Sequence, residues 1–261
     1  MSGSGWALPT GSLEQWPEDY ERGRPGWPSR AVDVAGLPST AAVLDLGAGT
    51  GKLTRVLSAK FKQVVAVEPA DAMRRLLAAN CPEAQALDGA AEAIPLADVS
   101  VDGVFAAEAF HRFEGAPAVA EIARVLRPRG ALVLMWNLPA GPWEPSIGRV
   151  EQFLDAHGCP SRADVGYDPF DLNTLRYESG EWRRPFEASP FEEFQETTLQ
   201  HVQMLDRDGL VAFLASMGWI GDLPDEERKP LLEGVRSRLG AVEYRRVWET
   251  RIHTTLLAGN A

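Results

Sequence analysis

Three closely spaced glycines form the segment with the clearest chemical meaning, Val43-Leu44-Asp45-Leu46-Gly47-Ala48-Gly49-Thr50-Gly51. An apolar run that ends in such glycines predicts a buried strand that turns tightly into a helix. Glycine has no Cβ and accepts dihedral angles that other residues avoid, so the loop can pass close beneath a bulky ligand and direct its N–H groups at it. The segment therefore predicts a site for a nucleotide-like cofactor.

The glycine spacing and two acids indicate which cofactor this is. A dinucleotide fingerprint reads Gly-x-Gly-x-x-Gly, whereas here Gly51 comes one position early. Asp45 stands two residues before the first glycine, where a carboxylate suits an ammonium group better than phosphates. Glu68 follows the apolar run 64–67, and an acid about 20 residues after the loop is placed to accept both ribose hydroxyls. The structural alternatives are a helix-start acid for Asp45 and a solvated strand end for Glu68.

These residues lie within an alternation of strands and helices. We expect strands near residues 42–46, 64–68, 84–88, 102–107 and 130–136, with a helix over 52–60 and helical patterns in the other connections. Strands that alternate with helices predict an α/β fold, in which helices cover both faces of a parallel sheet and ligands bind at the carboxyl ends of the strands.

The chain divides into four parts around this core, which spans residues 41–137. Residues 1–40 form an N-terminal segment with a short helix near 31–37. Residues 138–190, with a helix over 147–157, are interpreted as an insertion that helps cover the substrate. Residues 191–261 complete the same domain with an antiparallel pair, 192–203 and 244–257, joined through helices at 207–217 and 225–239.

Five segments that follow one another along the core resemble one known family. They are VLDLGAGTGKLT, VVAVEPADAM, DGAAEAIPLADVSVDGV, AEAFHRF and EIARVLRPRGALVLMWN. The run from Val43 to Asn137 is similar to class I S-adenosylmethionine-dependent methyltransferases, in the small-molecule group (methyltransferase type 11) that includes trans-aconitate methyltransferase-like proteins. EDYERGRPGWP and WIGDLPDEERKPLLEGVRSRLG resemble the same subgroup. The resemblance implies a Rossmann-like fold with a mostly parallel seven-stranded sheet, S-adenosylmethionine (SAM) as cofactor and S-adenosylhomocysteine (SAH) as product.

The resemblance also implies which residues hold the cofactor. They lie in an N-terminal lid, in the glycine loop, and after the second, third and fourth strands. The set is Tyr20, Arg24, Asp45, Gly47, Ala48, Gly49, Thr50, Leu53, Glu68, Pro69, Met73, Ala90, Ala91, Glu92, Ala107, Glu108 and Phe110. Met73 is equally compatible with a place in the core, and Glu92 with a helix or turn charge.

Three positions depart from the family pattern. Relatives often have an acid at the position of Ala90, which accepts a hydrogen bond from the adenine amino group. Here the backbone of Ala90 and Ala91, or the side chain of Asp88 or Glu92, would take that role. Gln is common at the position of Glu108 and Trp at that of Arg112, so both changes alter the polarity beside the expected reaction centre.

His111 is the candidate catalytic residue. It follows the fourth strand, and imidazole titrates near neutrality, so it could act as a general base; the alternative is that it orients a loop by hydrogen bonding to the backbone. A base is needed only if the acceptor is a hydroxyl or an acidic carbon, since a carboxylate attacks as it is. Arginines could bind an anionic acceptor, with surface charge as the alternative. Tryptophans could wall an apolar pocket or stabilise the sulfonium by a cation–π contact, with a core role as the alternative. These arginines and tryptophans are Arg22, Arg24, Arg112, Arg183, Arg184, Trp27, Trp136 and Trp143.

Composition argues against several partners. The formal net charge of −11 over 261 residues disfavours nucleic acid and anionic membrane surfaces. The start of the chain has no signal-peptide pattern, and no apolar run approaches the ~20 residues of a membrane span, so we expect a cytoplasmic protein. Cys81, Cys159 and four scattered histidines predict neither a metal site nor a disulfide. The sequence does not indicate the oligomeric state.

Three functions fit this pattern. The first is a methyltransferase that acts on a carboxylate, hydroxyl or acidic carbon of a small molecule, such as a secondary metabolite. The second is an enzyme that uses the same fold to cyclise, rearrange or cleave the sulfonium cofactor. The third is a binding protein with a relict pocket, which the intact glycines and Glu68 argue against. A dinucleotide oxidoreductase ranks below all three, because the later third glycine is missing.

Overall fold

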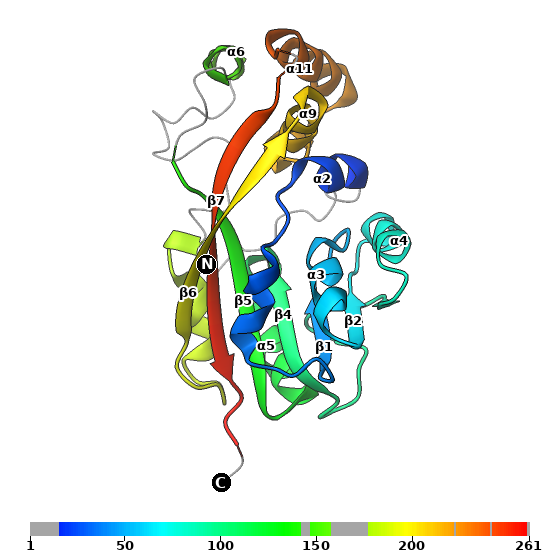
Figure 1. The fold of residues 1–261 in the computed structure, drawn as a ribbon, viewed down its shortest axis with the longest axis vertical. Helices are drawn as coiled ribbons and strands as arrows, with labels where there is room; N and C mark the ends of the chain where they lie inside the picture. Colours follow the sequence, from blue (N-terminus) through cyan, green and yellow to red (C-terminus); the bar gives the residue numbers. More distant parts are fainter. Residues whose placement is uncertain (1–15, 142–146, 158–176, 222, 241, 260–261) are drawn as a thin grey trace, which may run out of the picture.

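The computed structural model describes residues 16–141, 147–157, 177–221, 223–240 and 242–259. Its centre is a seven-stranded sheet in the order β3-β2-β1-β4-β5-β7-β6 (Figure 1). The strands are β1 Ala42–Leu46, β2 Gln63–Val67, β3 Gln85–Leu87, β4 Val101–Ala107, β5 Leu126–Pro139, β6 Gln195–Leu205 and β7 Tyr244–Leu256. β1 to β5 pair in parallel, and β7 is antiparallel to both β5 and β6. The predicted mostly parallel, seven-stranded α/β fold is confirmed.

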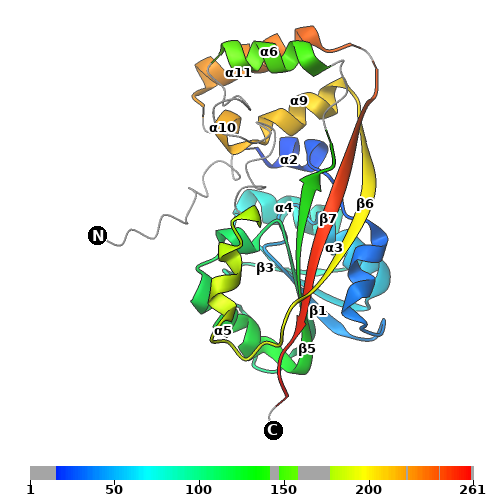
Figure 2. The same cartoon turned by 90° about the vertical axis from the view of Figure 1, so that its left-hand side faces the viewer.

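Helices cover both faces of the sheet (Figure 2). One face carries η1 Ser29–Ala35, α3 Lys52–Lys60 and α4 Asp71–Asn80, and the other carries α5 Gly115–Val125 with η4 Glu181–Phe186. Successive strand residues point to opposite faces. Val43 and Phe105 therefore pack beside η1 and α3, whereas Leu44 and Val104 pack on the α5 side.

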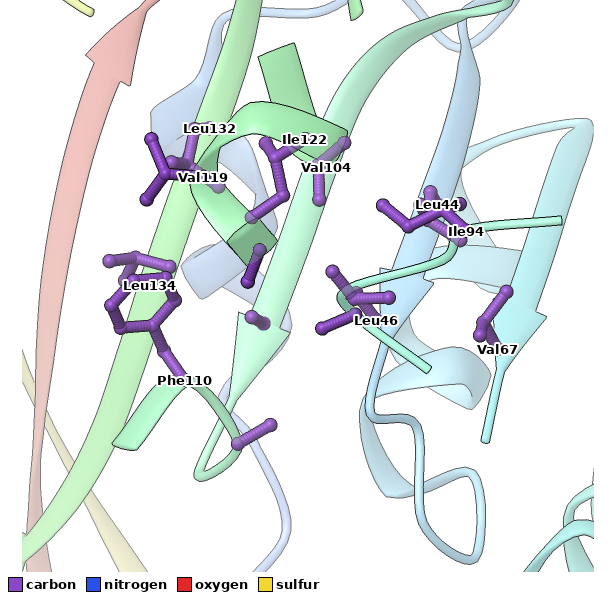
Figure 3. Close-up of a cluster of buried hydrophobic side chains, with 14 of the residues drawn as sticks. Leu44, Leu46, Val67, Ile94, Val104, Phe110, Val119, Ile122, Leu132 and Leu134 are labelled. Carbon is purple, nitrogen blue, oxygen red and sulfur yellow. The ribbon is translucent and has the colours of Figure 1, made fainter. Parts of the chain in front are cut away.

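The core beneath α5 fixes the two strands that lead to the expected reaction centre. Val119 and Ile122 of α5 lie against Val104 of β4 and Leu132 of β5, and all four are buried (Figure 3). Burial of one such side chain contributes about 1.5–3 kcal/mol. This packing holds β4 and β5 in place, and so positions the residues that follow their carboxyl ends.

A separate helical layer, here called the helical cap, lies at the carboxyl end of the sheet (Figures 1 and 2). It consists of α6 Gly148–Ala156, α9 Arg207–Ala215, α10 Gly218–Gly221 and α11 Asp225–Arg238, which share an apolar cluster of their own. A short helix, α2 Pro17–Gly23, lies between the cap and the sheet. Among the described residues of the expected cover 138–190, α6 joins this layer through the shared apolar cluster, whereas η4 packs on α5.

Most predicted elements are confirmed to within a few residues, with three differences. The connection 88–100, expected to be helical, consists of turns and a bridge between Ala90 and Ala93. β5 is longer than the predicted 130–136. Its pairing with β4 shifts register between Val101 and Gly103. This shift lies near Pro128, which has no N–H, and Arg129, which has a φ of +66°. The expected helix near 31–37 is the 3₁₀ helix η1. Within the described ranges, no helix is long and apolar enough to span a membrane.

Candidate functional site

The glycine loop joins β1 to α3 at the carboxyl edge of the sheet. Gly47, Gly49 and Gly51 have φ values of +73°, +57° and +90°, a left-handed conformation that costs other residues roughly 1–2 kcal/mol. The amides of Gly47 and Ala48 donate to the carbonyl of Val67 at 2.9 and 3.1 Å. The end of β2 therefore fixes the start of the loop.

Two of these glycines have very different surroundings. A Cβ on Gly51 would lie 2.7 Å from Sγ of Cys81 and 2.9 Å from Cδ1 of Leu77, so this glycine allows α3 to pack on α4. For Gly49, the one described contact within 4 Å would be Cε1 of Tyr20, at 3.9 Å. Gly49 thus faces away from the packed interior and leaves room for a ligand to approach the backbone.

Glu68, directly after β2, reaches back to this loop. Its Oε2 accepts the Gly49 amide at 2.8 Å, and its Oε1 accepts the Ala70 amide at 2.9 Å. The residue is only 8% exposed. Burial raises the pKa of Glu68, against the opposing effects of the two amides and of Arg112 and Arg74. The strand-end acid expected to bind ribose is therefore held in one orientation at the glycine loop.

Asp45 lies beneath the loop and is 1% exposed. Oγ1 of Thr54, in the first turn of α3, donates to Oδ2 of Asp45 at 2.6 Å. Burial raises the pKa of Asp45 to about 7 in spite of that bond, and the charge of Glu68 adds to the effect. Asp45 thus has the partner expected of a helix-start acid, which is compatible with the predicted role toward an ammonium group.

Tyr20 of α2 lies beside charged residues from several parts of the chain. Burial raises the pKa of its hydroxyl, and the charges of Arg24, Glu108, Arg112 and Glu68 act on it in turn. The predicted lid residue Tyr20, the ribose-binding candidate Glu68 and two of the three departures from the family pattern, Glu108 and Arg112, are therefore neighbours in space.

The other polar residues of α2 tie this helix to its surroundings. Arg24 was predicted at the cofactor, but its Nε and Nη2 donate to Oγ and the carbonyl of Ser216, both at 2.9 Å, and so hold α2 on the helical cap. Glu21, which was not predicted, accepts hydrogen bonds from Thr50 and from Arg55 of α3. No local pattern marks Glu21, because its partners lie 29 and 34 positions away.

The residues after β4 meet the end of β5. Glu108 has a φ of +52°; its amide donates to the Met135 carbonyl at 2.9 Å, and its Oε1 accepts the Asn137 amide at 2.7 Å. Nδ1 of His111 accepts a hydrogen bond from Nε1 of Trp136 at 3.3 Å. Glu108, which departs from the family pattern, and His111, the candidate catalytic residue, are thus both hydrogen-bonded to residues of β5.

Several residues that were predicted to contact the cofactor also make contacts within the protein. Leu53, Met73 and Phe110 are buried, and Phe110 packs against the ring of Phe186 at a centroid distance of 5.2 Å. Oε1 of Glu92 accepts the amide of Glu114 at the start of α5, 2.6 Å away, as expected of a turn charge. For these residues the cofactor contact stays a prediction.

The small residues of the predicted set line the same edge. Ala90 forms an isolated bridge with Ala93, Ala91 belongs to the core beneath α5, Pro69 is exposed, and Ala107 ends β4.

The arginines and tryptophans that were proposed to contact the acceptor have different surroundings in the structure. Arg22 pairs with Asp206, Arg184 pairs with Glu181, and Arg183 lies over the ring of Trp182. Trp27 packs beside η1 and α3, and Trp136 is buried in the core beneath α5. Trp143, like Cys159, lies outside the described residues. Arg112 is the arginine of this set whose charge acts on both Glu68 and Tyr20.

Comparison with known proteins agrees with this architecture. Residues 44–134 match the family model of a methyltransferase domain. An uncharacterized methyltransferase of Mycobacterium tuberculosis (strain ATCC 25618 / H37Rv) is 38% identical over 223 residues, which cover 84% of this chain and 82% of the relative. Malonyl-[acyl-carrier protein] O-methyltransferase of Methylococcus capsulatus is 44% identical over 101 residues, which cover 36% of this chain and 37% of that protein.

A solved structure has the same fold. The "Putative Type II Methyltransferase" from Anaeromyxobacter dehalogenans superposes with a TM-score of 0.63 at 24% identity and covers 91% of this chain and 99% of its own. The fold, the domain match and a relative that is similar over most of both chains agree with one another. The chain therefore belongs to the class I S-adenosylmethionine-dependent methyltransferases.

Proposed function

We propose that this methyltransferase binds SAM between the glycine loop, Glu68 and α2, and transfers the methyl group to a small-molecule acceptor that presents a carboxylate, hydroxyl or acidic carbon. The hydrogen bond of 2.8 Å between the Gly49 amide and Glu68 carries the proposal. A carboxylate has two oxygens and about four lone pairs, so Glu68 can hold the loop and still accept hydroxyl donors.

The described residues fit such a cofactor. A Cβ on Gly49 would have Tyr20 as its described neighbour, at 3.9 Å, so the backbone is open to a ligand on that side. Asp45 supplies a buried carboxyl beneath the loop, and Tyr20 lies beside the open side of Gly49. When bound, SAM supplies an electrophilic methyl group on a sulfonium whose leaving group is a neutral thioether.

The chain itself contributes mainly by positioning. A reacting pair held in line within about 3–3.5 Å gains most of its rate from orientation. Glu21 holds α2 over the loop, where it excludes water, and Glu108 fixes the turn after β4 to Asn137. Arg112 would receive an anionic acceptor, because a guanidinium binds a carboxylate with two parallel N–H groups.

The charge of the chain supports a small acceptor, and one relative supports oxygen as the atom that accepts the methyl group. The net charge of −11 disfavours a phosphate backbone as partner. The relative from Methylococcus capsulatus is named for O-methylation of a malonyl group on acyl carrier protein, which supports an oxygen acceptor.

The test is calorimetric titration of the purified protein with SAM, SAH and NAD, followed by mass analysis of SAM after incubation without an acceptor. Micromolar binding of SAM and SAH, no binding of NAD and an intact cofactor would support the proposal and justify a screen of carboxylates and other metabolites. Conversion of SAM without an acceptor would favour the cyclising or cleaving alternative, and failure to bind SAM would contradict the proposal.

A further inference from the structure

The contact between Trp136 and His111 determines which nitrogen of the imidazole carries the proton. Nε1 of Trp136 donates to Nδ1 of His111 at 3.3 Å. An indole N–H can only donate, so Nδ1 must present its lone pair. In a neutral imidazole one nitrogen carries the proton and the other accepts. The proton of His111 therefore lies on Nε2.

Trp136 cannot easily turn its N–H elsewhere. Its side chain is 1% exposed, and the rings of Trp182, Tyr177 and His253 surround it at centroid distances of 5.0, 5.3 and 5.8 Å. Its backbone pairs with Arg251 of β7. Turning the indole would require these rings to move, and buried rings are closely packed.

The second histidine beside Trp136 does not disturb this arrangement. Burial lowers the pKa of His253 to about 4, with a further lowering from Arg183 and Arg251 that Glu196 opposes. His253 is therefore neutral near pH 7. Its Nε2 lies 3.0 Å from the hydroxyl of Tyr177, so its described hydrogen bond is made away from the indole N–H.

We propose that Trp136 is a positioning residue that holds His111 as the neutral tautomer protonated on Nε2, so that His111 does not remove a proton from the acceptor during the reaction. The catalytic part rests on the proposed function. If Nδ1 of His111 took up a proton, its N–H would point at the Nε1–H of Trp136, which is unfavourable. Nε2 cannot accept a proton either, because it already carries a hydrogen. His111 thus lacks the lone pair that a general base uses.

This role narrows the class of acceptor. An acceptor that arrives as an anion, such as a carboxylate, needs no base. A neutral hydroxyl would have to lose its proton to a residue other than His111. The proposal therefore favours the carboxylate among the three acceptor classes, and of the two roles that the sequence left open for His111 it disfavours the general base.

The test is long-range proton–nitrogen NMR of nitrogen-15-labelled, ligand-free protein at mildly alkaline pH, with His111 assigned by comparison with His111→Gln. We expect Nε2 at the limiting shift of a protonated ring nitrogen and Nδ1 at that of an unprotonated acceptor, with scalar coupling across the hydrogen bond to Nε1 of Trp136. The reverse pattern, or averaged shifts without that coupling, would overturn the proposal.

Two variants separate the hydrogen bond from packing. Trp136→Phe keeps a ring but removes the donor, and should move the His111 shifts toward the average of both tautomers. Trp182→Phe disturbs the same aromatic cluster but keeps the Trp136 donor, and should leave the shifts at their limits. Equal averaging in both variants would contradict the proposal. If Trp136→Phe does not fold, the coupling in the wild-type protein still decides. Because no ligand is present, a failed SAM titration would refute the proposed function without changing this result.

Discussion

Thr50 of the glycine loop donates a hydrogen bond to Oε2 of Glu21 on α2, so a helix that precedes the sheet is tied to the candidate cofactor site. The other oxygen of Glu21 accepts Nη2 of Arg55 at 2.7 Å, and its carbonyl accepts Nζ of Lys52 at 2.6 Å. At the end of the same helix, Arg24 is bound to the helical cap. α2 therefore connects the cap to the loop.

Removal of this tie should loosen the cover over the cofactor. We expect Glu21→Ala to weaken SAM binding about fivefold to thirtyfold, which corresponds to the ~1–2 kcal/mol of a partly buried charged hydrogen-bonding group. Calorimetry should show the loss, together with faster proteolysis within α2. Glu18→Ala, on the exposed part of the same helix, is the matched control and should bind normally. Equal affinities in the two variants would show that α2 does not cover the cofactor.

Glu68→Ala should weaken both SAM and SAH binding by more than tenfold. The substitution leaves two ribose hydroxyls without an acceptor and frees the amides of Gly49 and Ala70, and each unpaired buried group costs about 1–3 kcal/mol. Titration calorimetry measures the effect, with Glu83→Gln on the exposed surface as a control. Unchanged affinity would remove Glu68 from the site.

Alanine substitutions at Gly49 and Gly51 should affect SAM binding and stability differently. Gly49→Ala should lose SAM binding while it destabilises the fold by about 1–2 kcal/mol, the cost of a left-handed backbone. Gly51→Ala should destabilise the fold by about 1–3 kcal/mol more, because its Cβ would collide with Cys81 and Leu77. Urea unfolding and calorimetry on both variants separate these effects. Similar unfolding midpoints would contradict the different surroundings of the two glycines.

Asp45 should make the fold less stable as pH rises. Its pKa is raised from 3.8 to about 7, so between these values the native state binds more protons than the unfolded state, and the free energy of unfolding falls with increasing pH. Asp45→Asn keeps an oxygen for Thr54 but does not titrate, and should remove this decline. Urea unfolding between about pH 4 and 7 compares the slopes, whose difference approaches ~1.4 kcal/mol per pH unit at most. Parallel slopes would mean that Asp45 is ionised throughout.

His111→Ala should lower turnover more than cofactor affinity. The substitution leaves the buried indole N–H of Trp136 without its acceptor, which costs about 1–3 kcal/mol, or roughly 5- to 150-fold in kcat if it disturbs the turn after β4, whereas SAM affinity should change less than threefold. His111→Gln keeps an acceptor for that N–H without a basic nitrogen and should retain most of the turnover. Steady-state kinetics with an acceptor found in the screen, beside SAM titrations, make the comparison. Equal losses in turnover and affinity would assign His111 a structural role.

Local residue patterns were enough to predict the framework of this protein. The apolar run 43–46, the glycines after it and the acid that follows Val67 are short-range signals, since each depends on neighbours within a few residues. They predicted the first two strands, the helix 52–60 and the place of Glu68 beside the loop, while the family followed from the resemblance of five segments along the core. Alternating strands and helices bring the carboxyl ends of parallel strands to one edge of the sheet. The candidate site residues between positions 45 and 112 follow those strand ends and therefore lie at the same edge.

Only the tertiary structure decided which partner each polar side chain has. Arg24 binds Ser216, 192 positions away, and Trp136 reaches back 25 positions to His111. Glu92 bonds an amide at the start of α5 because the turn that carries it packs beside that helix. Periodicity indicates which face of an element is buried, but the side chain met on that face depends on how distant elements cross, and that is a property of the packed chain as a whole.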